Sequence, residues 1–234
     1  FIILMAIYSY NVLLQTKKIE VLKQQFSSIS TDKSVQVLLI TWGFGGLLEG
    51  MAGFGTAVAI PAAILMSLGY RPVFSALVSL IANSVPTAFG AVGVPVIVLA
   101  QETGLPVIPL STAVVLQLSV LMFLVPLVIT FLADPRMKAL PKNLVLSVLV
   151  GGVSLVAQYL AARYVGAETP AIVGAIASII VIVVLGKLTG RGEEKSVPMT
   201  YSGGEVFRAW TVYVLIMVLI LFTSPLFPAV REML

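Results

Sequence analysis

Long apolar runs separated by short polar stretches dominate the chain. A helix needs about 20 mostly apolar residues to cross the hydrocarbon core of a bilayer. Runs close to that length, the first of them truncated, occupy residues 1–14, 110–132, 144–163, 170–187 and 207–227. The pattern predicts an all-α polytopic membrane protein, a transmembrane helix bundle embedded in the lipid bilayer. The first run opens at Phe1 without an initiator Met. We therefore expect residues 1–234 to form a single transmembrane domain within a longer polypeptide.

The loops between these runs differ in charge, and this difference predicts their orientation. Lys and Arg residues gather in three of them, at Lys17, Lys18, Lys23 and Lys33, at Arg136, Lys138 and Lys142, and at Lys187, Arg191, Lys195 and Arg208. Residues 101–109 contain no Lys or Arg, and residues 164–169 follow a single Arg. By the positive-inside rule, the basic loops, including residues 188–206, are cytoplasmic and the other two are external.

Residues 34–100 do not read as simple spanning helices. Segments 36–50 and 53–67 are each about 15 residues, roughly 22 Å of helix, which is short for a core of about 30 Å. A re-entrant hairpin that enters from the cytoplasm fits them better than two tilted spans. Segment 72–100 then crosses outward, but it is interrupted around Pro86 and again at Gly90, Gly93 and Pro95. A hairpin close to a broken helix is typical of the binding site of an ion-coupled transporter.

Glu49 is the principal candidate for chemistry in this region. It and Arg71 are the only charged residues between Ser34 and Ala100, and six glycines lie between positions 43 and 55. An acid at membrane depth costs a few kcal/mol and is functional by default. Its alternative role is structural, as a helix cap or the partner of a lysine elsewhere. The glycines either open the helix or allow close helix packing. Arg71 reads as an interfacial anchor.

Several polar or small residues near the two interruptions are candidates for binding an organic anion. Backbone N–H groups at the starts of half-helices favour negative charge, and neighbouring hydroxyl and amide groups can add donors. The candidate ligand-binding residues are Gly53, Gly55, Thr56, Asn83, Ser84, Thr87 and, in the middle of another span, Gln117. Hydrogen bonding to a neighbouring helix is the alternative for the polar ones. We expect residues 34–100 to form the substrate and coupling region.

Composition removes several other classes of function. The chain is 59% hydrophobic and 10% charged, whereas soluble domains carry about 25% charged residues. It has no Cys and no His, so disulfides, thiolate chemistry and His-ligated metals are excluded within it. A carried proton must therefore sit on a carboxylate. The net charge of +4 is spread over short loops, which gives no nucleic-acid footprint. We expect no enzyme activity, cofactor or metal.

Two stretches resemble a known family. They are Leu-Glu-Gly-Met-Ala-Gly-Phe-Gly at residues 48–55 and Leu-Ile-Ala-Asn-Ser-Val-Pro-Thr-Ala-Phe-Gly-Ala-Val-Gly-Val-Pro at residues 80–95. Both closely resemble motifs of the L-lactate permease family, and the similarity extends over most of residues 34–230. The resemblance implies secondary transport of lactate, glycolate and related 2-hydroxymonocarboxylates, coupled to protons, across a bacterial-type inner membrane. It also implies a full-length protein more than twice this length.

Some alternatives stay open. The family commonly has an arginine before the glutamine that corresponds to Gln117, and Leu116 stands there in this chain. That departure leaves open sodium or proton coupling with a different organic anion as substrate. A passive anion channel is the other alternative, although one singular acid beside broken helices differs from the repeated rings of a channel. A homodimer is also open.

Overall fold

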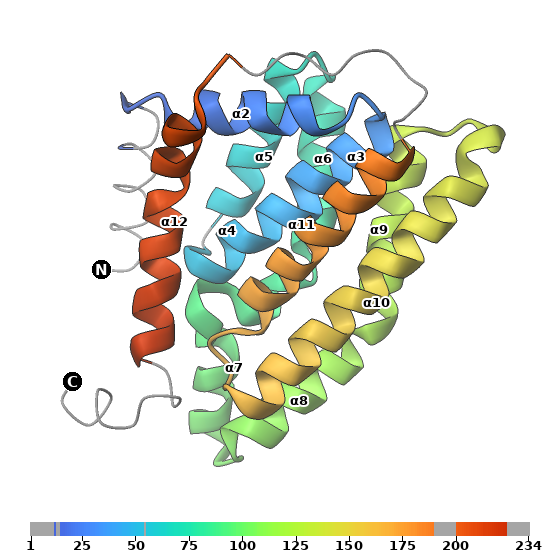
Figure 1. The fold of residues 1–234 in the computed structure, drawn as a ribbon. Coiled ribbons are helices and arrows are strands. Elements are labelled where there is room, and N and C mark those ends of the chain that lie inside the picture. Colours follow the sequence, from blue (N-terminus) through green and yellow to red (C-terminus); the bar gives the residue numbers. More distant parts are fainter. Residues whose placement is uncertain (1–11, 13–14, 54, 190–199, 224–234) are drawn as a thin grey trace.

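The described part of the chain is a bundle of helices. The computed structural model describes residues 12, 15–53, 55–189 and 200–223, and these contain helices and no strand. Figure 1 shows most helices running between two ends of the molecule, with α2 (Lys18–Ile29) lying across one of them. That end, called the basic end below, also carries the connections before α3 and after α9, where Lys33 and Lys138 lie. The predicted all-α membrane fold is confirmed.

The chain next forms a hairpin of unequal arms. The first arm is a 19-residue helix, Lys33–Met51, made of α3 (Lys33–Leu38), the π-helical turn η1 (Leu39–Phe44) and α4 (Gly45–Met51). The second arm, α5 (Thr56–Ser67), returns to the basic end (Figure 1). The first arm starts earlier than the predicted residue 36, because the Asp32 side chain caps the helix by accepting a hydrogen bond from the Val35 N–H at 3.1 Å.

A broken helix follows the hairpin, as the sequence predicts. It consists of α6 (Pro72–Asn83), a short 3₁₀ turn η2 (Pro86–Phe89) and α7 (Gly90–Thr103), with a bend of 54°. Proline has no N–H to continue the helical ladder, so the helix breaks at Pro86. Within α7, Ala91, Val92 and Gly93 have left-handed backbone angles, with φ of 44°, 63° and 74°. Such angles are costly for Ala and Val, and the surrounding packing holds them.

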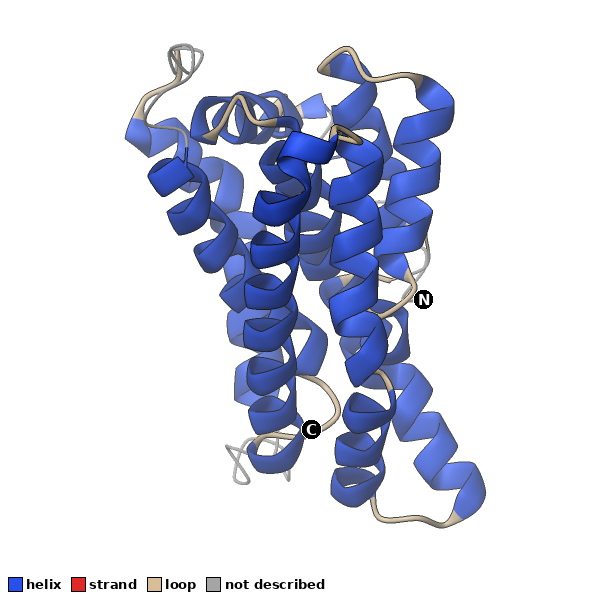
Figure 2. Cartoon of the chain, turned by 90° about the vertical axis from the view of Figure 1, so that its right-hand side faces the viewer, coloured by secondary structure: helices blue, strands red, loops and turns tan. Residues whose placement is uncertain are grey.

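The remaining helices complete the bundle. The predicted span 110–132 forms two helices, α8 (Val107–Gln117) and α9 (Ser119–Ala133), bent by 43° at Leu118. After the turn η3 (Met137–Ala139), the predicted spans 144–163 and 170–187 appear as α10 (Leu140–Tyr164) and α11 (Pro170–Thr189), with slightly longer bounds. α10 and α11 pack against each other along the bundle (Figure 1), and Figure 2 shows from the side that most helices run in roughly the same direction. Span 207–227 corresponds to α12 (Gly203–Thr223). Span 1–14, apart from Val12, and most of loop 188–206 lie outside the described residues.

Three glycines, Gly43 in η1 and Gly46 and Gly50 in α4, place the first arm of the hairpin directly against α11. Added methyl groups at Gly43 and Gly50 would lie 2.8 Å from Cγ1 atoms of Ile179 and Ile172, and one at Gly46 would lie 3.5 Å from Cβ of Ala175. The three glycines therefore form one face that allows the two backbones to approach closely, as small residues do between membrane helices. Of the two interpretations of these glycines, the structure supports close packing.

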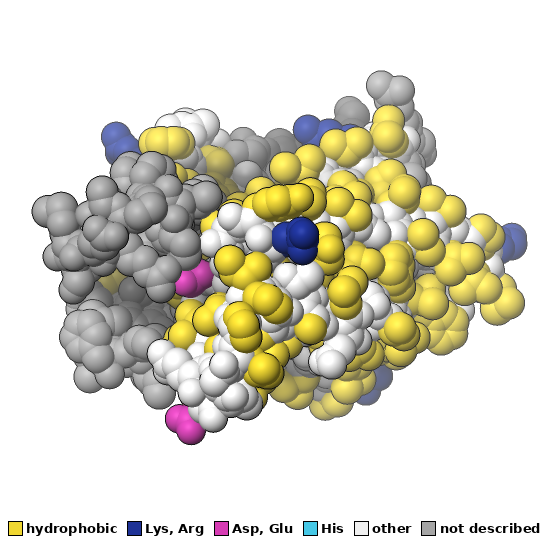
Figure 3. Space-filling model, turned by 90° about the horizontal axis from the view of Figure 1, so that it is seen from below, with side chains coloured by type: hydrophobic (Ala, Val, Ile, Leu, Met, Phe, Trp, Pro, Cys, Tyr) yellow, Lys and Arg dark blue, Asp and Glu magenta, His cyan; other side chains and the backbone are white. Residues whose placement is uncertain are grey.

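Apolar side chains cover the outside of the bundle. Val120, Leu124, Val145 and Val156 are among many that are at least 48% exposed. Figure 3 looks at the outer end, opposite the basic end, and its described surface is mostly hydrophobic with a few scattered charges. An apolar exterior is expected of helices that face lipid.

Candidate functional site

Glu49 lies in the last turn of α4, enclosed by the hairpin and the broken helix. Only 4% of the residue is exposed. Its carboxyl group fits against Gly90 at the start of α7, because a methyl group added there would overlap Glu49 Oε1 and lie 3.2 Å from Cδ. The second carboxyl oxygen, Oε2, is buried and has no hydrogen-bond partner among the described residues. A buried acceptor without a partner is unusual in a folded protein and marks Glu49 as a candidate functional group.

Asn83, the last residue of α6, reaches Glu49 from the other side. Its side chain lies near enough to the Glu49 carboxyl group to act on it electrostatically. Its amide nitrogen also donates to Thr87 Oγ1 at 3.0 Å, and the Thr87 hydroxyl donates back to the Asn83 carbonyl oxygen. Asn83 Oδ1 is buried without a partner in the described part of the chain. Asn83 thus links the break after α6 to Glu49, and its Oδ1 remains available as an acceptor.

The hairpin tip touches the broken segment directly. Gly53 adopts a φ of +58°, and a methyl group added to it would lie 3.0 Å from both Cβ and N of Ala91. The left-handed turn at Ala91 is thereby seated against the tip. Gly93, at the end of that turn, packs so closely on the Ala167 carbonyl, between α10 and α11, that a methyl group there would overlap it. Tip, broken helix and the 167–168 connection form one continuous contact.

The other predicted site residues lie around this cluster or away from it. Gly55 (φ +88°) is exposed, and no atom of the described residues lies within 4 Å of an added methyl group. Ser84 is exposed, and its hydroxyl donates to the Ile81 carbonyl at 2.7 Å. The Thr56 side chain lies outside the described residues. Gln117 is exposed at the end of α8, which packs on α10, α7 and α9 rather than on α4. The structure therefore does not bring Gln117 to Glu49.

Two polar positions near the cluster were not singled out from the sequence. Gln158 of α10 is 3% exposed, with Nε2 donating to Ser154 Oγ at 2.9 Å and Oε1 unpaired among the described residues. It borders a cavity of about 10 Å³, room for about one water molecule, lined by Trp42, Gly46, Pro86, Ser154, Gln158, Ala171 and Ala175. Glu168, before α11, has a buried Oε2 for which the described part of the chain offers no partner. A polar residue inside an otherwise apolar span was the available signal for Gln158.

Charge is distributed unevenly between this cluster and the basic end. No ion pair of Glu49 with Lys or Arg occurs among the described residues, whereas two ion pairs lie at the basic end. Arg136 holds Asp134 through Nε–Oδ1 and Nη2–Oδ2 contacts of 2.7 Å, which lowers the pKa of that carboxyl group to about 2. Lys142 pairs with Asp32. Within the described residues, no group of three or more Asp and Glu side chains is arranged to hold a metal.

These features define a class of protein. A buried acid without a cation, a hairpin tip and a helix broken at the same depth are the elements from which secondary transporters build their sites. The described residues offer such an arrangement once, at Glu49, Asn83 and Gly90. The fold is that of a multi-pass membrane protein, which in bacteria resides in the plasma membrane, and the arrangement at Glu49 is of the kind found in transporters.

Sequence comparisons identify the family. The chain matches the family model described as L-lactate permease over residues 1–234. It is 41% identical over 239 residues to an L-lactate permease of Streptococcus iniae, covering 100% of this chain and 50% of that protein. An L-lactate permease of Bacillus subtilis is 35% identical over 94% of the chain and 42% of the relative. Glycolate permease GlcA of Escherichia coli is 33% identical over 94% of the chain and 43% of the relative.

The chain belongs to the L-lactate permease family, a family of transporters rather than enzymes. It spans about half the length of the curated relatives it matches. No solved structure matches it. The family resemblance inferred from residues 48–55 and 80–95 is confirmed.

Proposed function

We propose that the protein to which this chain belongs carries small 2-hydroxymonocarboxylates, such as L-lactate and glycolate, across the plasma membrane by proton symport. The observation that carries this proposal is the position of Glu49, buried against Gly90 and within reach of Asn83, with one carboxyl oxygen unpaired among the described residues. The names of the relatives support the substrate class, since they are lactate and glycolate permeases.

In this mechanism Glu49 carries the coupled proton. The chain contains no His, and Glu49 is the sole acid of residues 34–100. Glu168, the other acid near the cluster, follows Ala167 on the Gly93 side of α7, whereas Glu49 lies against Gly90 at the break itself, so Glu49 is our candidate for the titrating group. A charged carboxylate without a cationic partner is unfavourable away from water. Protonation removes that charge, so a loaded, neutral Glu49 favours closure of the site around the substrate, and proton release on the other side favours opening.

The anion site lies where the hairpin tip meets the break. A substrate carboxylate needs several converging donors once it leaves water. The start of α5 after Gly55 supplies N–H groups that have no partner within the helix, together with a favourable dipole. One side of the anion site is the hairpin tip, with Gly53, Gly55 and Thr56. The opposite side is the break in the helix, with Asn83, Ser84 and Thr87. Residues 34–100 accordingly make up the substrate and coupling region.

The decisive experiment compares accumulation with exchange in Glu49→Gln. The full-length protein is reconstituted in proteoliposomes, and uptake of labelled lactate is driven by an imposed pH gradient. Glutamine keeps the shape of the side chain but cannot ionise. We expect accumulation above equilibrium to be lost, while exchange of internal for external lactate continues.

Glu102→Gln is the matched control, because Glu102 is an exposed acid at the end of α7. It should accumulate lactate like the unmodified protein. If Glu49→Gln also accumulates lactate in response to the pH gradient, Glu49 does not carry the proton. If a sodium gradient drives lactate accumulation by the unmodified protein and a proton gradient does not, the coupling to protons is wrong. Lactate would still be the substrate in that case.

A further inference from the structure

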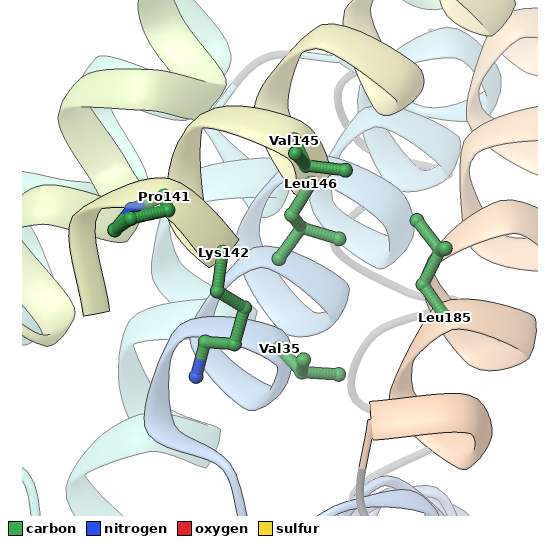
Figure 4. Close-up of a pocket in the computed structure, with 6 residues that line it drawn as sticks. All are labelled: Val35, Pro141, Lys142, Val145, Leu146 and Leu185. Atoms are coloured by element: carbon green, nitrogen blue, oxygen red, sulfur yellow. The ribbon is translucent and has the colours of Figure 1, made fainter. Parts of the chain in front are cut away.

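An apolar pocket lies at the basic end, away from the Glu49 site. It has a volume of about 300 Å³, the lower end of the range for small-ligand sites, and lies between α3, α10 and α11. Figure 4 shows its lining residues, Val35, Pro141, Lys142, Val145, Leu146 and Leu185. Lys142 is the only one of the six with a polar side chain. The pocket therefore suits an apolar group that has a negative charge beside it.

The packing of the three helices explains why the pocket exists. α10 and α11 are joined at the outer end and separate toward the basic end, where α3 lies beside α11 (Figure 1). A methyl group at Gly186 of α11 would lie 2.9 Å from Cγ1 of Val35, so α11 and α3 are in close contact. Val35 and Leu146 are buried, while Val145 is 57% exposed. The pocket thus has a closed inner wall and opens sideways through the apolar outer surface.

Its depth and its charges fit a membrane lipid. Val145 lies five residues into α10, about 8 Å along the axis at 1.5 Å per residue. In a bilayer whose surface lies level with the start of α10, that is the depth of the upper acyl chain, because the head-group region is about 5–8 Å thick on each side. Lys142, beside the pocket, pairs with Asp32 yet keeps 30% of its side chain exposed, and its ammonium group has three donors. The exposed side chains of Lys33, Lys138 and Lys187 add positive charge at this end.

We propose that this pocket binds one acyl chain of an anionic phospholipid from the cytoplasmic leaflet, with the lipid phosphate against Lys142. Basic pockets between transmembrane helices on the cytoplasmic side bind anionic lipid head groups in this way. A water-soluble anion could pair with Lys142 but would leave the apolar pocket empty. A neutral lipid could occupy the pocket but would not form the ion pair with Lys142. The bound acyl chain contacts both α3 and α10. α3 is the start of the hairpin arm that carries Glu49.

The test uses the full-length protein, purified in neutral detergent and stripped of lipid. Native mass spectrometry measures binding of phosphatidylglycerol and of phosphatidylcholine with identical acyl chains. We expect one tightly bound phosphatidylglycerol, with an affinity about fivefold above that of phosphatidylcholine, which is the preference that one lysine near the membrane surface gives. Lys142→Gln should abolish the preference, and Lys142→Arg should retain it.

A matched pair of substitutions tests the apolar walls. Val145→Trp fills the pocket and should remove the tightly bound lipid. Val156→Trp places the same side chain on the same helix at nearly the same exposure, 58% against 57%, but away from the pocket, and should leave binding unchanged. Equal binding of the two lipids by the unmodified protein would overturn the proposal. So would tight phosphatidylglycerol binding by Val145→Trp, or an equal loss in Val156→Trp.

Discussion

Gly90 provides the space that the Glu49 carboxyl group occupies. The two residues come from different elements, α7 and α4, and 41 positions of sequence separate them, yet a methyl group on Gly90 would overlap Glu49 Oε1. Gly90 also follows the 3₁₀ turn of the broken helix. The break and the acid are therefore coupled, since a shift of either one changes the room available to the other.

Replacing Gly90 by alanine should displace the acid. Because Glu49 is enclosed, its carboxyl group must move or the start of α7 must shift, and overpacking of this kind costs about 1–3 kcal/mol. We expect lactate uptake by Gly90→Ala to fall by roughly 5- to 150-fold, the factor to which that cost corresponds at about 1.4 kcal/mol for each factor of ten. Gly152→Ala is the control, because its methyl group would meet a single ring atom at 3.8 Å. Normal uptake by Gly90→Ala would contradict this reading of the contact.

The face between α4 and α11 gives a second prediction, this time on stability. Alanine at Gly50 would place a methyl group 2.8 Å from the Ile172 side chain and 3.0 Å from its backbone N, whereas alanine at Gly46 meets Ala175 Cβ at an ordinary 3.5 Å. Alanine also raises helix propensity by about 1 kcal/mol over glycine at either position. Gly50→Ala should therefore lower the Tm of the purified protein, while Gly46→Ala should leave it unchanged or raise it. Equal shifts for both would show that the glycine face does not set the helix spacing.

The sequence predicted the helices better than the contacts between them. Apolar runs located α10 and α11, and Pro86 located the break, because both features are local. The bend at Leu118 has no such signal, since neither Pro nor Gly stands there and only the polar Gln117 and Ser119 flank it. The left-handed turn at Ala91 was not foreseen either, because it depends on how Gly53 and the 167–168 connection pack against it. Contacts between distant segments are set by three-dimensional packing, which no local pattern records.

The candidate site shows the same division. Glu49 and Asn83 stand out in the sequence because polar residues are rare in apolar segments, and the structure places them within reach of one another. Gln117 stood out for the same reason, but it lies exposed at the end of α8. Gln158 is equally polar and is buried next to Pro86. The presence of a polar residue in an apolar segment does not indicate whether its side chain is buried. For this reason the sequence analysis singled out Gln117 and missed Gln158.

Asp134 at the basic end should make stability depend on pH. Its contacts with Arg136 lower its pKa from 3.8 to about 2. A group whose pKa is lowered on folding stabilises the folded state above its ordinary pKa, and this contribution is lost as pH falls through the folded value. Asp134→Asn should thus lower the Tm at pH 6. The difference from the unmodified protein should shrink between about pH 4 and pH 2, the window set by the two pKa values. A difference that is constant from pH 6 to pH 2 would show that the charge of Asp134 is not responsible.

The charges near the site predict its selectivity among anions. Within residues 34–100 the only cation is Arg71, which lies exposed between α5 and α6, at the end of the hairpin remote from its tip. A dicarboxylate would therefore bring a second charge into the site without a partner, and unpaired buried charge is strongly disfavoured. We expect glycolate to displace labelled lactate in proteoliposomes, while succinate competes poorly. Succinate that competes as well as glycolate would contradict this assignment of the site.

Substitution of Asn83 tests recognition of the substrate's 2-hydroxyl group separately from recognition of its charge. Its Oδ1 is a buried acceptor with no partner among the described residues, whereas the Ser84 hydroxyl already donates to Ile81. If Asn83 accepts a hydrogen bond from the substrate hydroxyl, losing it costs about 1–3 kcal/mol, roughly 5- to 150-fold in affinity. Asn83→Ala should therefore bring the KM for lactate close to that for propionate, which lacks the hydroxyl, while Ser84→Ala keeps the preference. A preference for lactate that survives Asn83→Ala and disappears in Ser84→Ala would move the hydroxyl contact to Ser84.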